Sequence, residues 1–268
     1  MTQTSPTVLA LDFDGVICDG LIEYFQTAWQ AYCQIYSPSN SSPPSGLAEQ
    51  FYKLRPVIET GWEMPMLLRS LVTGVSEVEI LDHWGAIAQQ QAQQTKLSPT
   101  EIAAKVDQVR DNWISTDLAG WLAQHRFYSG VQEWLRQVLA SSVYLVIITT
   151  KEGRFVQRLL QQQQVDLPVE QIFGKEVQQP KAQTLRALRQ QLKPKSDHPL
   201  HIWFVEDRLK TLQSIQKQSD LSDIKLFLAD WGYNLPSDRE IARQDENIHL
   251  LSIETLSQSF SEWCNFNT

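Results

Sequence analysis

Short, uninterrupted apolar runs are the feature that most limits the folds open to this chain. Four of them are VLALDF at residues 8–13, VYLVIITT at 143–150, HIWFVED at 201–207 and IKLFLAD at 224–230. Because both faces of such a run are apolar, we expect each one to be a strand covered on both sides, as in parallel sheets between helices. A weaker fifth run, IHLLS at 248–252, is expected to form the last strand.

Helical patterns lie between the apolar runs in the second half of the chain. Apolar residues recur at helical spacing in the segments VQEWLRQVLA, GRFVQRLLQQQQ, AQTLRALRQQL and LKTLQSIQKQ. Strand and helix therefore alternate. This alternation predicts an α/β fold with a Rossmann-like, doubly wound parallel sheet.

The region from about residue 18 to 125 has a different pattern, with helical segments such as LIEYFQTAWQAY and no convincing strand. Two capping-box spacings indicate helix starts there: Ser76 with Glu79, and Ser98 with Glu101. We therefore predict a core domain built from residues 1–17 and 125–268. A helical cap domain, residues 18–124, would be inserted after the first strand.

Composition narrows the classes of partner. A formal net charge of -8 argues against broad binding to nucleic acid or anionic membranes, which needs an excess of Lys and Arg. The three cysteines are scattered and odd in number, which favours a reducing cytosol over a disulfide framework. We expect no signal peptide, because the first residues lack a basic region followed by an apolar stretch, and no membrane span, because no apolar run is long enough. We expect a cytoplasmic protein, and nothing in the sequence indicates its oligomeric state.

Acidic and hydroxyl side chains follow three of the predicted strands: Asp12 and Asp14 the first, Thr149 and Thr150 the second, Glu206 and Asp207 the third. The carboxyl ends of parallel neighbours meet at one edge of a sheet, where ligands bind in such folds. Four carboxylates gathered there would repel one another unless a divalent cation lay between them. Because all the ligands are oxygens, the cluster predicts a Mg²⁺ site.

These residues belong to motifs that resemble those of the haloacid dehalogenase superfamily, most of whose members are phosphatases. DFDGV is similar to the first motif, IITTK to the second, PKAQTL to the third and FVEDRLKTL to the fourth. The flanking stretches YSGVQEWLRQVL and ADWGYN are similar to those of phosphoglycolate phosphatase-like members. Four motifs in the expected order make the resemblance much more specific than a lone DxDG would.

The resemblance implies a role for each motif. Asp12 would attack phosphorus and form an aspartyl phosphate, and Asp14 would serve as general acid and then general base. Thr149 and Lys181 would stabilise the transferring phosphoryl group, although which of Thr149 and Thr150 points into the site is open.

The resemblance also implies a ligand set for Mg²⁺: Asp12, the backbone carbonyl of Asp14, Glu206 and Asp207. Gly15 would let the backbone turn sharply and approach the phosphoryl oxygens.

Two motifs depart from the family pattern. The fourth is more often Gly-Asp with a later Asp, whereas here Glu206 and Asp207 are adjacent and Arg208 follows them. This Glu-Asp form resembles that of phosphoglucomutase-like members. The third motif has Ala after Lys181 instead of the common Pro, which leaves Lys151 and Lys175 as rivals for its role.

We predict a Mg²⁺-dependent phosphatase that hydrolyses a small phosphorylated metabolite, with phosphoglycolate as one candidate. Arg55 and Glu59, at helical spacing in the cap, are candidate contacts to the leaving group, although an exposed helix face is the default interpretation. The alternatives are a phosphomutase with the same two aspartates and a non-catalytic binding or regulatory module on this scaffold.

Overall fold

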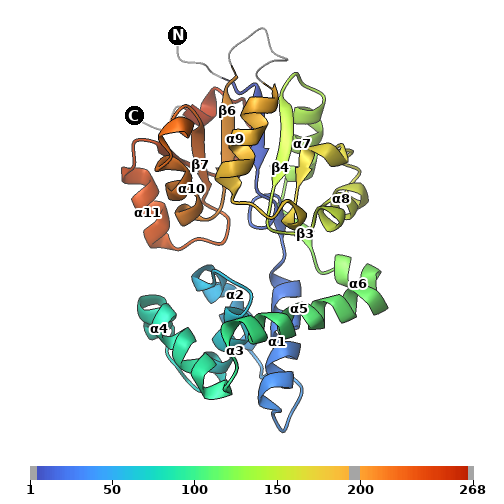
Figure 1. Ribbon diagram of the computed structural model, residues 1–268, viewed down its shortest axis with the longest axis vertical. Coiled ribbons are helices and arrows are strands. Elements are labelled where there is room, and N and C mark those ends of the chain that lie inside the picture. Colours follow the sequence, from blue (N-terminus) through green and yellow to red (C-terminus); the bar gives the residue numbers. More distant parts are fainter. Residues whose placement is uncertain (1–4, 193–199, 265–268) are drawn as a thin grey trace. The chain divides into compact units, whose positions relative to one another are not determined.

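The computed structural model describes residues 5–192 and 200–264, and the chain divides into two compact units (Figure 1). One unit combines Met1–Asp19 with Phe127–Thr268. The other, a helical insert, is Gly20–Arg126. The short strands β2 (Cys18–Asp19) and β3 (Arg126–Phe127) pair with each other where the chain passes between the units.

A six-stranded sheet forms the centre of the first unit. Its order is β5-β4-β1-β6-β7-β8, and all its strands are parallel. The strands are β1 (Val8–Leu11), β4 (Tyr144–Ile148), β5 (Ile172–Phe173), β6 (Ile202–Glu206), β7 (Lys225–Ala229) and β8 (Ile248–Leu251). If the six strands are renumbered 1 to 6 along the chain, their order is 3-2-1-4-5-6, which is that of a doubly wound fold. The strand order changes direction at β1, and ligands bind at this point in such folds.

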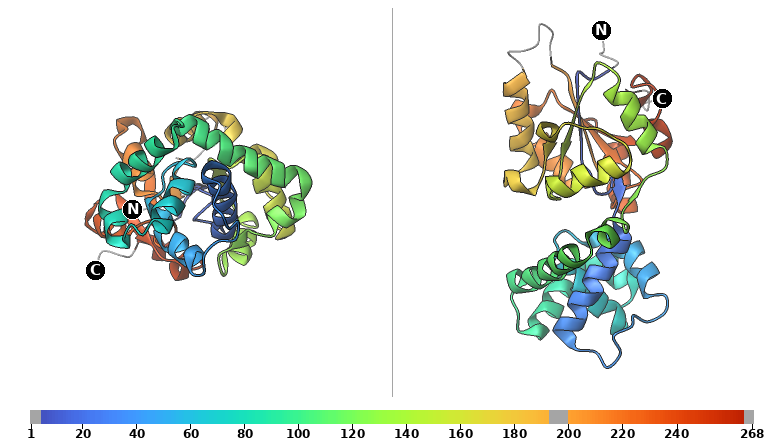
Figure 2. Two further views of the ribbon diagram at one scale, coloured as in Figure 1. Left: turned by 90° about the horizontal axis from the view of Figure 1, so that it is seen from below. Right: turned by 90° about the vertical axis from the view of Figure 1, so that its right-hand side faces the viewer.

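Helices cover both faces of this sheet (Figure 2). The helices of the unit are α7 (Val131–Leu139), α8 (Gly153–Gln162), α9 (Lys181–Leu192), α10 (Leu209–Gln216), α11 (Pro236–Gln244) and α12 (Ile253–Leu256). Short 3-10 turns occur at η2 (Val169–Gln171), η3 (Lys175–Val177), η5 (Ser219–Leu221) and η6 (Glu262–Cys264).

The two faces of the sheet have different cores. Apolar residues of α9, α10 and α11 pack on one face in a single buried cluster with Ala10 of β1 and Phe204 of β6. On the other face, Trp203 and Phe227 pack against Trp263 of the C-terminal segment, which in turn stacks on Trp134 of α7. Burial on both faces explains why these strands are continuously apolar.

The helical insert contains α1 (Leu21–Tyr36), α2 (Leu47–Leu54), α3 (Glu63–Val72), α4 (Glu77–Thr95), α5 (Pro99–Thr116), α6 (Leu118–Leu122) and the 3-10 turn η1 (Arg55–Val57). Both predicted capping boxes are confirmed: Ser76 with Glu79 begins α4, and Ser98 with Glu101 begins α5. Within the described residues, no helix is both long and apolar enough to cross a bilayer.

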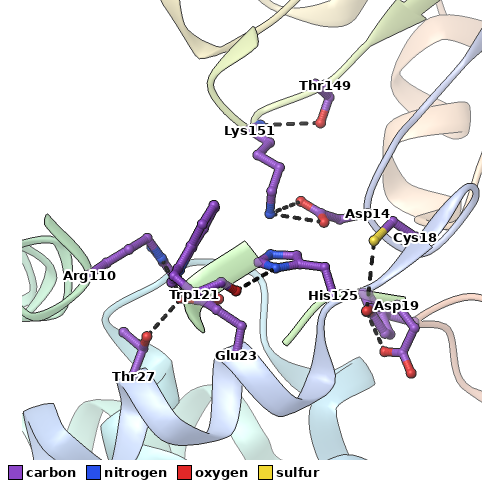
Figure 3. A network of polar contacts seen from close by, with 11 residues as sticks. Asp14, Cys18, Asp19, Glu23, Thr27, Arg110, Trp121, His125, Thr149 and Lys151 are labelled. Atoms are coloured by element: carbon purple, nitrogen blue, oxygen red, sulfur yellow. Dashed lines mark hydrogen bonds and ion pairs between the residues drawn. The ribbon is translucent and has the colours of Figure 1, made fainter. Parts of the chain in front are cut away.

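A buried ion pair ties three helices of the insert together (Figure 3). Glu23 of α1 is fully buried and receives a two-pronged contact from Arg110 of α5, with Nε to Oε1 at 2.8 Å and Nη2 to Oε2 at 3.3 Å. Thr27 and Trp121 also donate to Oε1 of Glu23, at 2.7 and 3.1 Å. The carboxylates around Arg110 more than offset the effect of its burial, so the pKa of this guanidinium is raised.

The predicted fold class is confirmed: a Rossmann-like parallel sheet with an inserted helical unit. All five expected strands are present, whereas β5 escaped prediction. Strand β5 consists of only two residues, Ile172 and Phe173, and lies at the edge of the sheet. Two residues are too few to show a periodic pattern in the sequence. The two-residue strands β2 and β3 were missed for the same reason.

Candidate active site

Three parallel strands deliver polar residues to one edge of the sheet. Leu11 of β1 lies beside Ile147 of β4 on one side and Val205 of β6 on the other, so these three strands end nearly level. Asp12 continues the ladder beyond β1 by donating its N–H to the carbonyl of Val205 at 2.9 Å. The next side chains along each strand therefore meet beyond the sheet's carboxyl edge, as the apolar runs predicted.

Three carboxylates form a tight cluster at this edge. One oxygen each from Asp12, Glu206 and Asp207 can be chosen so that all lie within 4.8 Å of one another. The exposed fractions of these residues are 7%, 1% and 1%. Little water can reach the cluster to spread the negative charge, so the carboxylates interact strongly.

The cost of burying these charges appears as raised pKa values. Burial raises the pKa of Asp12 to about 7, and only part of that increase is offset by the charge of Lys181. Burial likewise raises the pKa of Glu206 to about 7, and the nearby charge of Asp207 adds to the effect. The pKa of Asp207 is also raised, mainly by burial and then by Asp12. Even with the charge of Lys181, and without a metal ion, Asp12 and Glu206 therefore bind protons more readily than exposed carboxylates do.

Lys181 is the cation inside the cluster. It is the first residue of α9, and its Nζ lies 2.8 Å from Oδ1 of Asp12 and donates to Oε2 of Glu206 at 2.7 Å. Burial by itself would lower the pKa of this ammonium, but the two carboxylates outweigh burial and raise it. Lys181 therefore stays charged beside Asp12.

The two rival lysines lie elsewhere. Lys151 forms an ion pair with Asp14, its Nζ 3.2 Å from each carboxylate oxygen (Figure 3). Lys175 is exposed on η3. Of the three lysines, Lys181 is the one that contacts Asp12. This position agrees with the role predicted for the lysine of the third motif, which is to stabilise the phosphoryl group.

The cluster fits a divalent cation on its own geometry. Oδ1 of Asp12 is buried and lies 2.8 Å from Nζ of Lys181, and in the part of the chain that the structure describes it has no hydrogen-bond partner besides this ion pair. A lone pair that Lys181 does not face is thus available to a metal. All the donors are oxygens, which suits Mg²⁺. The side chain of Asp14 turns to Lys151 instead, so its predicted contribution to the metal is limited to its backbone carbonyl.

Gly15 is required by the packing of this cluster. Its φ is +89°, and a Cβ at this position would lie 2.1 Å from Oδ2 of Asp207 and 3.1 Å from the ring of Tyr233. Any larger residue would have to displace Asp207. This packing constraint on Gly15 stands beside the predicted approach to phosphoryl oxygens, which stays a prediction.

The loop after β7 orients Asp207, and prediction from the sequence missed its role. Tyr233 donates its N–H to Oδ2 of Asp207 at 2.8 Å, while Nδ2 of Asn234 donates to the carbonyls of Asp207 and Ala229 at 3.0 and 2.7 Å. A Cβ on Gly232 would lie 2.3 Å from Cβ of Asp207. The segment ADWGYN was noted in the sequence as similar to a family motif. Its hydrogen bonds to Asp207 form only when the chain is folded, so the sequence could not reveal that this loop orients Asp207.

Arg208, which departs from the family pattern, is built into the same support. Its N–H donates to Oε1 of Glu206 at 3.1 Å, and its Nη1 donates to the carbonyl of Tyr233 at 2.9 Å. The guanidinium thus joins the loop after β6 to the loop after β7. Arg208 therefore supports the backbone around Glu206 and Asp207, and both carboxylates remain in the cluster.

The remaining candidates are placed as follows. Thr149 is buried and its Oγ1 accepts the N–H of Lys151 at 3.2 Å, whereas Thr150 is exposed. Arg55 and Glu59 belong to the helical insert, where Arg55 donates to the carbonyl of Ile58 at 3.0 Å. The leaving-group contact assigned to Arg55 and Glu59 stays a prediction.

A comparison with models of known protein families identifies the family of this chain. A family model for haloacid dehalogenase-like hydrolases matches residues 65–219, more than half of the chain. The chain belongs to this family. The match includes Thr149, Lys181, Glu206 and Asp207, while Asp12 lies before its start. Family membership, inferred at first from four short motifs, is confirmed.

Solved structures of similar fold extend over nearly the whole chain. A predicted phosphatase from Clostridium acetobutylicum has a TM-score of 0.58 at 12% identity, covering 94% of this chain and 97% of that one. A predicted phosphoglycolate phosphatase from Haemophilus somnus has a TM-score of 0.56 at 14% identity, covering 98% and 97%. Protein Tyrosine Kinase A from Mycobacterium tuberculosis has a TM-score of 0.55 at 15% identity, covering 96% and 98%.

At these identities the likeness concerns the fold. The same fold carries a protein named a kinase and proteins named phosphatases, so activity has to be argued from the site. No curated protein sequence matches this chain.

Proposed function

We propose that this hydrolase is a Mg²⁺-dependent phosphatase that cleaves a small phosphorylated metabolite through an aspartyl-phosphate intermediate on Asp12. The observation that carries the proposal is the convergence of Asp12, Lys181, Glu206 and Asp207 at one sheet edge. Among the described residues, the buried Oδ1 of Asp12 has no hydrogen-bond partner besides its ion pair with Lys181. A carboxylate held beside a lysine in a cation-binding cluster is suited to attack a phosphate dianion, which must first be neutralised.

In the first step, an oxygen of Asp12 attacks phosphorus and the ester P–O bond breaks. Asp14 gives its proton to the departing oxygen, so the product leaves as an alcohol. Lys181 stays charged because its pKa is raised, and it balances the negative charge that passes to the phosphoryl oxygens. When bound, Mg²⁺ supplies further positive charge to the same oxygens.

In the second step, water attacks the phosphorus of the aspartyl phosphate. Asp14, now ionised, takes a proton from this water, the bond between phosphorus and the Asp12 oxygen breaks, and phosphate is released. Asp14 has thereby recovered the proton that it lost. We assign Thr149 to holding the phosphoryl group: its Oγ1 accepts the N–H of Lys151, which leaves its own proton to be donated.

The substrate class is inferred from similar structures and from the helical insert. The names of similar structures support a phosphorylated metabolite, and phosphoglycolate is one candidate because a structure of this fold is named for that activity. Arg55 and Glu59 in the insert remain candidate determinants of the leaving group.

A phosphomutase is the second candidate, because the adjacent pair Glu206 and Asp207 resembles the form found in phosphoglucomutase-like members. Such an enzyme would return the phosphoryl group to its substrate and release little free phosphate. A non-catalytic module is the third reading. It gives no reason for a nucleophile, an acid and a lysine to be held in one site.

The test is phosphate release from 2-phosphoglycolate, glycerol 3-phosphate, a sugar phosphate and an aryl phosphate, with Mg²⁺ and with EDTA. We expect metal-dependent release by the wild type and none above background for Asp12→Asn, which keeps the size of the side chain and removes the nucleophile. Asp223→Asn is the matched control, because this acid lies at the surface with its side chain 60% exposed. Release that survives Asp12→Asn would refute the aspartyl-phosphate mechanism.

A further inference from the structure

Lys151 makes a symmetrical contact with the carboxylate of Asp14. Its Nζ lies 3.2 Å from Oδ1 and 3.2 Å from Oδ2, so one ammonium contacts both oxygens (Figure 3). The side chains of Lys151 and Asp14 are only 9% and 16% exposed. At this depth an ion pair is poorly screened by water, and it limits rotation of the carboxylate more than a surface pair would.

The backbone of Lys151 is held on both sides. Its N–H donates to Oγ1 of Thr149 at 3.2 Å, and its carbonyl accepts the N–H of Lys175 at 2.9 Å. Gly153, two residues after Lys151, begins α8 and donates its N–H to the side chain of Glu176 at 3.0 Å. The turn between β4 and α8 is therefore anchored, and the lysine extends from a fixed base.

The backbone of Asp14 is anchored as well. Gly15 donates its N–H to the carbonyl of Cys18 at 2.8 Å, and a β-bridge joins Asp14 to Cys18. Asp14 and Lys151 follow β1 and β4, which are neighbours in the sheet. The ion pair thus connects two anchored turns at the active-site edge.

The two lysines of the site, both mostly buried, contact different aspartates. Lys181 contacts Asp12 and Glu206 in the acidic cluster, whereas Lys151 contacts Asp14. Because the ammonium of Lys151 donates to both oxygens, the contact is that of a carboxylate, the form of Asp14 that accepts a proton. We propose that Lys151 is a positioning residue that orients the carboxylate of Asp14 to take a proton from the water that cleaves the aspartyl phosphate. This inference rests on the proposed function, in which Asp14 is the general base of the second step.

The proposal makes the effect of Lys151 specific to the second step. A dinitrophenolate is stable as an anion and leaves without help from an acid, so phosphorylation of Asp12 by 2,4-dinitrophenyl phosphate needs little from Asp14. In the second step, the oxygen of water bonds to phosphorus, the bond between phosphorus and the Asp12 oxygen breaks, and Asp14 takes the proton of the water. Loss of orientation should therefore slow hydrolysis of the aspartyl phosphate and spare its formation.

The experiment follows dinitrophenolate release from 2,4-dinitrophenyl phosphate in the wild type, Lys151→Met and Lys151→Arg, before and during the steady state. The rate of the initial burst reports phosphorylation of Asp12, and the steady-state kcat reports hydrolysis of the intermediate. Lys151→Met should lower kcat by about tenfold or more, part of the 10²–10⁴ that general base catalysis supplies, and leave the burst rate nearly unchanged. Lys151→Arg, which keeps the charge, should recover part of the loss.

A double-mutant cycle with Asp14→Asn completes the test. If Lys151 acts through Asp14, Lys151→Met should have little further effect on kcat once Asp14 is replaced. Equal losses in burst rate and kcat, additive losses in the cycle, or a raised KM with unchanged kcat would each overturn the inference. A wild type that cleaves neither 2,4-dinitrophenyl phosphate nor glycerol 3-phosphate would refute the proposed function itself, a result distinguishable from loss of the second step alone. Circular dichroism of each variant checks that it folds.

Discussion

Gly15→Ala should damage the acidic cluster more than it damages the fold. The new Cβ would lie 2.1 Å from Oδ2 and 2.5 Å from Cγ of Asp207, distances that real contacts do not reach. Asp207 cannot simply swing away, because it is 1% exposed and its Oδ2 accepts the N–H of Tyr233 at 2.8 Å. The alanine therefore has to push a predicted metal ligand out of its place.

The chain offers a matched control in Gly130→Ala. Gly130 has a φ of +80°, close to the +89° of Gly15, but a Cβ there would meet nothing within 4 Å. Both variants pay the strain of a left-handed alanine, about 1–2 kcal/mol. Gly15→Ala adds the cost of overpacking, about 1–3 kcal/mol, so we expect it to destabilise the unit by about 2–5 kcal/mol in total.

Thermal unfolding and calorimetric titration with Mg²⁺ measure the two effects separately. Gly130→Ala should lower Tm modestly and leave Mg²⁺ affinity unchanged, whereas Gly15→Ala should lower Tm further and weaken Mg²⁺ binding. The reasoning fails if the two variants are equally destabilised, or if Gly15→Ala binds Mg²⁺ as tightly as the wild type.

Three further predictions follow from other contacts. Lys181→Met breaks a buried ion pair and should lower the free energy of unfolding by about 3–5 kcal/mol at pH 8, and by less at pH 5.5, where the carboxyls can protonate. Denaturant unfolding measures this loss, with Lys175→Met as the exposed control. Equal losses for the two variants would contradict the prediction. Burial holds the pKa of Asp12 at about 7, above its unfolded value near 4, so without metal its contribution to stability is full below pH 4 and is lost as pH rises through 7. Since Mg²⁺ competes with these protons, its effect on Tm should be larger at pH 8 than at pH 5.5, and a pH-independent effect would count against a carboxylate site. Arg110→Met should destabilise the helical insert by about 3–5 kcal/mol because Glu23 is left buried and ionised, and a double replacement with Glu23→Leu should recover most of that loss in the same unfolding assay.

Much of the fold could be predicted because its signals are local. A strand buried on both faces must be apolar throughout, and a capping box is complete within four residues, so both were visible in the sequence. The edge strand β5 was not visible, since two residues carry no period. The doubly wound class of sheet could be predicted from the alternation of strand and helix, whereas the order of its strands is seen only in the structure.

The candidate site was only partly predictable. The types of residue needed for phosphoryl transfer follow the strands in order, so Asp12, Asp14 and the acidic pair could be named in advance. Their partners could not. Lys151 and Asp14 are separated by 137 positions, and nothing near either residue indicates that their side chains meet.

The sequence by itself determined the class of fold, the family and the set of chemical groups, because each depends on short patterns along the chain. Tertiary structure alone decided which lysine contacts which aspartate, why Gly15 cannot carry a side chain, and how Tyr233 and Asn234 hold Asp207. The reason is physical: a hydrogen bond or a steric clash depends on distances of a few ångströms, and residues far apart in the chain reach those distances only when the sheet and its loops are packed.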